Sequence, residues 1–86
     1  MIEKGVFLMK PHVCLNDLQP GQQAIVQELR STGSIRRRLL DMGLIQNTIV
    51  QCLGRSPGGD PSAFLIRGAV IAIRAVDGQH IWVTPC

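Results

Sequence analysis

Aromatic side chains are scarce in this sequence, which contains no tyrosine and only Phe7, Phe64 and Trp82. Two common uses of a small β-rich domain depend on such side chains. A groove for proline-rich ligands is lined with aromatic rings, and a surface for single-stranded nucleic acid stacks bases on them. The scarcity therefore argues against proline-rich ligands and leaves nucleic acid only as a second hypothesis for the binding partner.

Long hydrophobic runs are also missing. The longest, residues 6–9 and 69–73, are far shorter than the ~18 residues needed to cross a membrane, and no basic and apolar leader precedes the first of them. We therefore expect a cytosolic protein that does not insert directly into a membrane.

Cysteines are few and irregularly spaced. Cys14, Cys52 and Cys86 are odd in number and have no Cys-x-x-Cys spacing. A disulfide framework pairs its cysteines, and a zinc knuckle needs that short spacing. We therefore expect reduced thiols.

Metal-ligand pairs and catalytic motifs are absent as well. The histidines are His12 and His80, with no His-x-x-x-His or Glu-x-x-His pair on the predicted helix. His12 and Cys14 could place two ligands on one side of an extended segment, but both lie in a predicted arm. A nucleotide loop and a recognisable triad are also missing. Because 86 residues leave little room for a deep substrate cavity, we expect no cofactor, no tight metal site and no enzymatic activity.

What the sequence does contain is one clear helix signal, residues 35–45, which read IRRRLLDMGLI. At ~100° per residue, Ile35, Leu39 and Met42 fall on one narrow stripe that we predict faces the core. Leu40 lies ~100° from that stripe, among the arginines. Gly43 follows the stripe, where a left-handed residue commonly ends a helix.

Five apolar stretches separated by turn signals are predicted as strands: 24–29, 48–53, 63–67, 69–74 and 80–84. Residues 56–61, SPGGDP, are predicted to form an exposed hairpin tip. A turn is predicted at 76–78. In the last strand, alternation directs Ile81 and Val83 inward and places His80 and Trp82 on the outer face.

Five short antiparallel strands with one helix cannot cover both faces of a flat sheet, so the sheet must curl and pack on itself. We predict an all-β fold, a small SH3-like antiparallel barrel of about five strands with one short helix after the first strand. Residues 1–14 lack a period and are predicted as a loosely ordered N-terminal arm. Residues 15–86 form the barrel domain, whose opening turn buries Leu15 and Leu18.

Four sequence features occur in a fixed order along the barrel domain: Leu15-x-x-Leu18-x-x-Gly21, RLLDMGL at 38–44, PGGDP at 57–61 and GxxIAIR at 68–74. Together they resemble the FeoA family, over roughly residues 15–83. The resemblance implies a small cytosolic SH3-like protein of bacterial ferrous iron uptake that assists the membrane transporter FeoB. The same fold forms the last domain of iron-dependent repressors. Because no DNA-binding helices precede it here, we expect a free-standing partner protein.

The partner-binding surface is predicted on the outer face of the helix, at Arg36, Arg37, Arg38 and Leu40, with Trp82 as a further candidate. An apolar residue ringed by arginines is typical of an interface anchor. Solvated arginines and a single exposed leucine are also ordinary surface features. The prediction is a non-enzymatic adaptor that docks on the cytosolic part of the FeoB membrane GTPase to support or regulate iron transport.

Two alternatives stay open. The competing hypothesis is a barrel that binds nucleic acid through Arg36, Arg37, Arg38 and Arg55, which the net charge of +3 permits. Self-association of the barrel is also compatible with the sequence.

Overall fold

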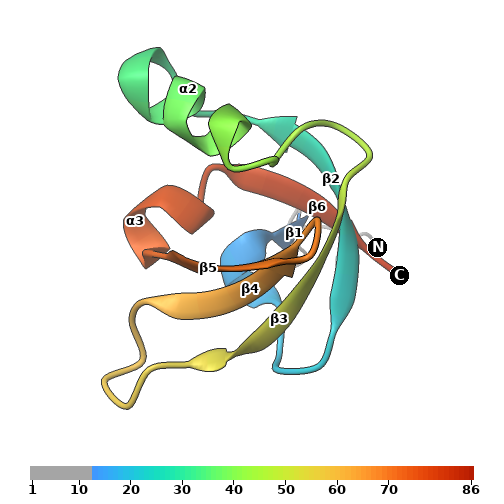
Figure 1. Ribbon diagram of the computed structural model, residues 1–86, viewed down its shortest axis with the longest axis vertical. Coiled ribbons are helices and arrows are strands. Elements are labelled where there is room, and N and C mark those ends of the chain that lie inside the picture. The colour runs from blue at the N-terminus through green and yellow to red at the C-terminus, as the bar shows by residue number, and fades with distance from the viewer. Residues whose placement is uncertain (1–12) are drawn as a thin grey trace, which may run out of the picture.

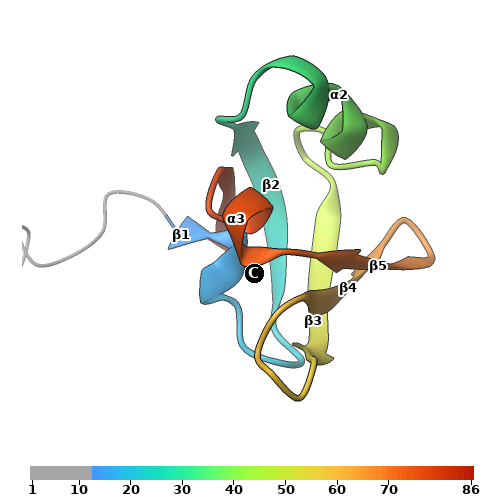
Figure 2. The ribbon, with the colours of Figure 1, turned by 90° about the vertical axis from the view of Figure 1, so that its left-hand side faces the viewer.

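Six strands form one antiparallel sheet in the computed structural model, which describes residues 13–86. In chain order the elements are β1 (Val13–Cys14), η1 (Leu15–Asp17), β2 (Gln23–Leu29), α2 (Gly33–Asp41), β3 (Ile49–Arg55), β4 (Ser62–Ile66), β5 (Ala69–Ile73), α3 (Ala75–Gly78) and β6 (Ile81–Pro85). The strand order is β1-β6-β2-β3-β4-β5, and every paired neighbour runs antiparallel. The sheet curls on itself with α2 over one end (Figures 1 and 2), which confirms the predicted small antiparallel barrel.

The core is filled by the inward residues of the strands, together with leucines from the helical segments. In β3, Val50 and Cys52 are buried, whereas Ile49 and Leu53 on the opposite face are exposed. In β6, Ile81 and Val83 are buried in the same way. Burying an aliphatic side chain of this size stabilises the fold by about 1.5–3 kcal/mol relative to leaving it exposed.

The N-terminal boundary of the sheet differs from the prediction. Val13 and Cys14, which we placed in the arm, form β1 and pair with Val83 and Trp82 of β6. A strand of two residues is too short to show a period, so only the pairing reveals it. Residues 1–12, the rest of the predicted arm, lie outside the described residues.

The connection between the last two strands is also more regular than predicted. The expected turn at 76–78 is part of the short helix α3, and η1 precedes β2. Leu15 and Leu18 at η1 are both buried, as predicted for the opening turn. The predicted tip at 56–61 does connect β3 to β4, closed by a hydrogen bond from the Ser56 N–H to the Pro61 carbonyl at 3.0 Å.

Helix α2 contacts the core in a different way from the predicted stripe. Leu39 is buried, but Ile35 is 40% exposed, so its assignment to the core was wrong. Leu40, predicted to face solvent, is half-buried and packs against the core together with Met42. The buried contacts of the helix thus gather at its C-terminal end. Periodicity gives the relative directions of side chains, whereas the orientation of the helix on the barrel decides which of them are covered.

Gly43 ends α2 with a φ of +99°, the left-handed conformation predicted for this position. A Cβ there would lie 2.8 Å from Cδ of Arg67. Gly43→Ala is therefore expected to lower the free energy of unfolding by about 1–2 kcal/mol, measured by urea denaturation. Gly58→Ala is the matched control, because nothing lies within 4 Å of a Cβ at Gly58 and its φ is not positive. Equal stability of the two variants would contradict the prediction.

Candidate partner-binding site

The three consecutive arginines of α2 make different contacts. Arg36 donates a hydrogen bond from Nη1 to the carbonyl oxygen of Leu29 at 3.0 Å. Nη2 of Arg38 lies 3.8 Å from Oδ2 of Asp77. Arg37 is exposed and has no hydrogen bond or ion pair within residues 13–86. All three remain at the surface, but only Arg37 presents a guanidinium that no neighbouring group engages in this part of the chain.

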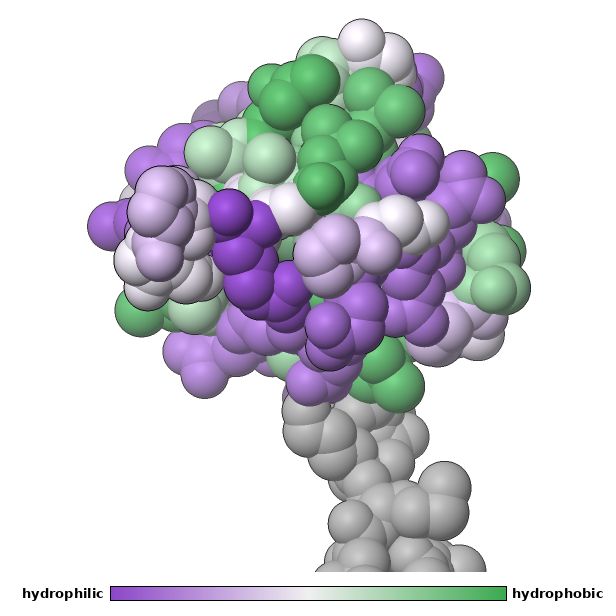
Figure 3. Space-filling view, turned by 90° about the horizontal axis from the view of Figure 1, so that it is seen from below, coloured by the Kyte–Doolittle hydropathy of each residue, from purple (hydrophilic) through white to green (hydrophobic). Residues whose placement is uncertain are grey.

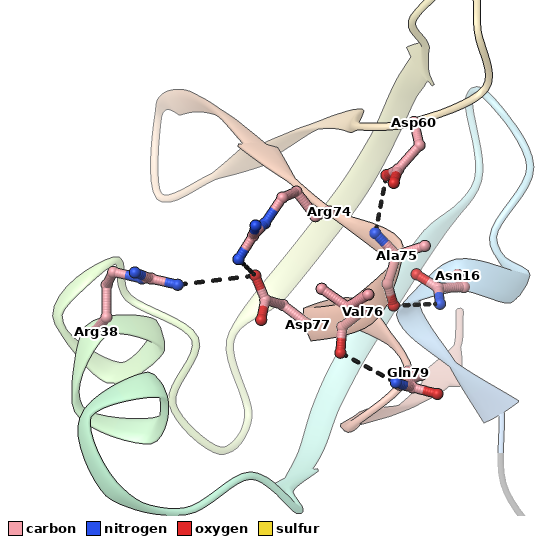
Figure 4. A network of polar contacts seen from close by, with 8 residues as sticks. All are labelled: Asn16, Arg38, Asp60, Arg74, Ala75, Val76, Asp77 and Gln79. Carbon is pink, nitrogen blue, oxygen red and sulfur yellow. Dashed lines mark hydrogen bonds and ion pairs between the residues drawn. The ribbon is translucent and has the colours of Figure 1, made fainter.

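Asp77 joins α2 to α3. Asp77 is 7% exposed, and its Oδ2 lies 3.5 Å from Nη2 of Arg74 and 3.8 Å from Nη2 of Arg38 (Figure 4). A buried carboxylate needs such partners, because an unpaired charge away from water is costly. Two arginines share one carboxylate, so this cluster keeps a net positive charge.

The backbone of α3 is held from two further sides (Figure 4). The Ala75 N–H donates to Oδ1 of Asp60 at 2.8 Å, and the Ala75 carbonyl accepts from Nδ2 of Asn16 at 2.9 Å. A helix this short is not stable in isolation. Its position is therefore set by contacts with the 56–61 tip, with η1 and with α2.

A groove separates the start of α2 from α3, with a volume of about 320 Å³. We call it the helix groove, and it is lined by Arg30, Ser31, Thr32, Ile35, Arg74, Val76, Asp77 and His80. Ile35 is 40% exposed and Val76 57%, so the groove presents apolar side chains beside basic ones. The Ser31 hydroxyl oxygen is buried and has no hydrogen-bond partner within the described part of the chain. The helix groove therefore combines apolar surface, positive charge and an unused hydroxyl group.

Trp82 contacts Arg30, one of the residues that line the helix groove. The Arg30 guanidinium carbon is 4.5 Å from the centroid of the Trp82 ring, and Nη1 of Arg30 is 2.6 Å from Oε2 of Glu28. A cation–π contact of this kind contributes about 0.5–1 kcal/mol at an exposed site. Trp82 is thus half-buried beneath a side chain that itself lines the helix groove, and His80 is exposed as predicted.

The apolar residues exposed beside the arginines are not the one that we predicted. Leu40 is partly withdrawn into the core, whereas Ile35 and Val76 are exposed next to the arginines. Sequence reasoning missed Ile35 because we assigned it to the core stripe, and it missed Val76 because we treated 76–78 as a simple turn. Both are apolar residues in segments with charged neighbours, which was the available signal.

The described residues offer few groupings of metal-ligand side chains. Residues 13–86 contain no group of three or more His, Cys, Asp or Glu side chains able to hold a metal ion. Cys52 is buried, Cys14 half-buried and Cys86 exposed, and all three are free thiols. His12, half of the weak His12 and Cys14 candidate, lies outside the described residues. None of the helices formed by these residues has the length and apolar character that a membrane span requires.

Each comparison of this chain with known proteins finds members of one family. The protein-family model of the FeoA domain matches residues 13–85 of this sequence. The chain is 32% identical, over 72 residues, to an Fe(2+) transport protein A/Fe(2+) transporter FeoB fusion protein of Porphyromonas gingivalis. The match covers 80% of this chain but 8% of the fusion protein, so the chain spans only a small part of that relative.

Two solved structures extend the comparison. The solution structure of the FeoA protein from Chlorobium tepidum has a TM-score of 0.80 at 29% identity, covering 85% of this chain and 70% of that one. The crystal structure of Stenotrophomonas maltophilia FeoA complexed with zinc has a TM-score of 0.70 at 25% identity, covering 83% and 88%. That protein is described as a prokaryotic SH3 domain protein with a suggested role as a ferrous iron transport activating factor.

Proposed function

The chain belongs to the FeoA domain family, which gives it a role in ferrous iron transport, and on this premise we propose that it is a non-enzymatic adaptor of a FeoB-like transporter. The adaptor docks on the cytosolic part of the transporter and supports or regulates transport. It works in the cytoplasm, at the inner face of the membrane, through this partner.

The observation that carries the proposal is the fusion protein of Porphyromonas gingivalis, in which a sequence like this one is part of the same polypeptide as FeoB. Covalent linkage keeps two domains at a high effective concentration. A separate chain with the same task needs a binding surface to reach the same partner.

The proposed surface consists of the outer side of α2 together with the helix groove. Arg36 and Arg37 supply positive charge, and Ile35 and Val76 supply apolar contact area. Such a surface fits an acidic partner segment with apolar side chains, because charge complementarity speeds association and buried apolar anchors hold the complex. Arg38 and Trp82 contribute less directly, since each is already engaged by a neighbouring side chain.

Arg37→Glu tests the proposal with the least effect on the fold, because Arg37 is exposed and makes no hydrogen bond or ion pair within residues 13–86. We expect association with the purified FeoB-like transporter to slow by roughly 3- to 10-fold at low salt and to depend less on salt. Association rates are measured by surface plasmon resonance. Arg37→Lys, which keeps the charge, is expected to bind normally. Unchanged kinetics for Arg37→Glu would place the contact elsewhere.

The alternative function, nucleic-acid binding, loses one of its four groups. Arg55 donates from Nη2 to the carbonyl oxygens of Asn16 at 3.1 Å and Leu18 at 3.0 Å. Its guanidinium is thereby directed to the backbone of the chain itself. Under the adaptor proposal, protein washed at high salt should elute without nucleic-acid absorbance.

A further inference from the structure

Strand β5 forms one edge of the sheet and is paired with a neighbour on one side only within residues 13–86. It follows β4 through a two-residue loop in which Arg67 and Gly68 have φ values of +51° and +85°, as in a type I′ hairpin turn. In such a hairpin Ile66 and Ala69 form the first hydrogen-bonded pair, and the pairs then alternate along the ladder. The backbone N–H and C=O groups of Val70 and Ala72 consequently point away from β4.

These edge groups are unused in the described part of the chain. No backbone hydrogen bond outside the β4–β5 ladder involves Val70 or Ala72 there. Val70 is 67% exposed, and Ala72 is also exposed. A strand edge with free donors and acceptors is a template for one more strand.

β5 also lacks the features that usually protect an edge. Its sequence, AVIAI, contains no charge and no proline, and its register with β4 is regular. Val70 lies opposite Leu65 on the outer face, and Leu53 of β3 is exposed as well. Figure 3, which views the molecule from below, shows a contiguous hydrophobic area on this side. An added strand would therefore find both backbone partners and apolar surface.

Charge at the two ends of β5 decides between possible occupants. Arg67 precedes the strand and Arg74 follows it, and both are exposed. If two copies paired through β5, matching Val70 with Ala72 of the second copy, Arg74 of each would lie beside Arg67 of the other. Like charges across paired strands are destabilising. Asp77 does not cancel this repulsion, because Arg74 shares it with Arg38.

We propose that the β5 edge binds an extended segment of another protein, apolar at alternate positions and with a carboxylate at each end. The segment adds a strand to the sheet by β-augmentation, and its carboxylates pair with Arg67 and Arg74. A hollow of about 420 Å³ beside the start of β5, bordered by Leu40, Met42 and Ala69, provides room for side chains of the segment that face inward. The site goes beyond the proposed adaptor function and does not depend on it.

The test uses the full chain, labelled with ¹⁵N, and a capped synthetic peptide of sequence Asp-Thr-Val-Thr-Val-Thr-Asp. We expect the amide signals of Val70 and Ala72 to shift and to become protected from hydrogen exchange on titration. A peptide with lysine in place of both aspartates is expected not to bind. Because the Ala72 N–H points away from β4, Ala72→Pro removes an edge donor while sparing the ladder. It should weaken binding by at least ~10-fold with the circular dichroism spectrum unchanged, whereas Ala72→Thr should bind normally.

Four results would overturn the proposal. Slow exchange of both amides in the free protein would mean that the edge is already covered. A concentration-dependent dimer abolished by Ala72→Pro would make a second copy the occupant. If the acidic peptide caused no shifts, the β5 edge would not be its binding site. If the lysine peptide bound equally well, the site would have no preference for carboxylates. The transporter is not present in this experiment, so its failure leaves the role of α2 intact.

Discussion

Phe64→Ala is expected to lower the free energy of unfolding by about 3–5 kcal/mol, measured by urea denaturation. Phe64 is 2% exposed and lies in β4, between Cys52 of β3 and Ile71 of β5. Truncation removes a large transfer free energy and leaves a cavity that three neighbouring strands cannot close without breaking their pairing. Because small domains are stable by only ~5–15 kcal/mol, the variant should approach the limit of folding.

Leu65→Ala is the matched control for this change. Leu65 is the next residue of β4, but it is only half-buried and points to the outer face. We expect its loss to cost less than ~1.5 kcal/mol. Similar destabilisation by both variants would mean that β4 does not distinguish an inner from an outer face in solution.

Ile35→Asp is expected to weaken binding to the FeoB-like transporter by at least ~2 kcal/mol, or about 30-fold. The change puts a carboxylate where an apolar anchor would be desolvated, and within a groove lined by Asp77. Because Ile35 is 40% exposed, stability should change by no more than ~0.5 kcal/mol. Isothermal titration calorimetry gives the affinity and thermal denaturation gives the stability.

Leu40→Asp separates the two sides of the helix. Leu40 packs against the core, so a carboxylate there should lower the free energy of unfolding by about 1–3 kcal/mol. If Ile35→Asp unfolds the domain instead, Ile35 belongs to the core in solution. If Ile35→Asp affects neither folding nor binding, the partner contacts another surface, and an unchanged affinity of Val76→Asp would exclude the helix groove as a whole.

The strands of this protein follow from the order of its residues. Alternation in β6 predicted that Ile81 and Val83 are buried, and the Gly and Pro residues at 56–61 predicted the tip. These signals are local, because a period of two residues and a turn propensity are properties of short segments. The family resemblance was also local in origin, resting on four short motifs, and the FeoA domain match over residues 13–85 confirmed the family.

The candidate site was only partly accessible to the same reasoning. Three adjacent arginines after a strand are visible in any reading of the sequence, and they do lie at the surface. The sequence did not show which apolar residue accompanies the arginines at the surface. Ile35 and Leu40 are both apolar positions of one short helix, and the tilt of that helix on the barrel exchanges their expected exposure.

The sequence by itself determined the long strands, the buried face of β6 and the left-handed end of α2, since each depends on residues within a few positions of one another. The fold class followed from the number and order of these local elements. Tertiary structure alone decided the groove between α2 and α3, the pairing of Arg38 with Asp77 and the open edge of β5. These features join residues far apart along the chain. Their positions depend on how separate elements pack, and no local pattern encodes that packing.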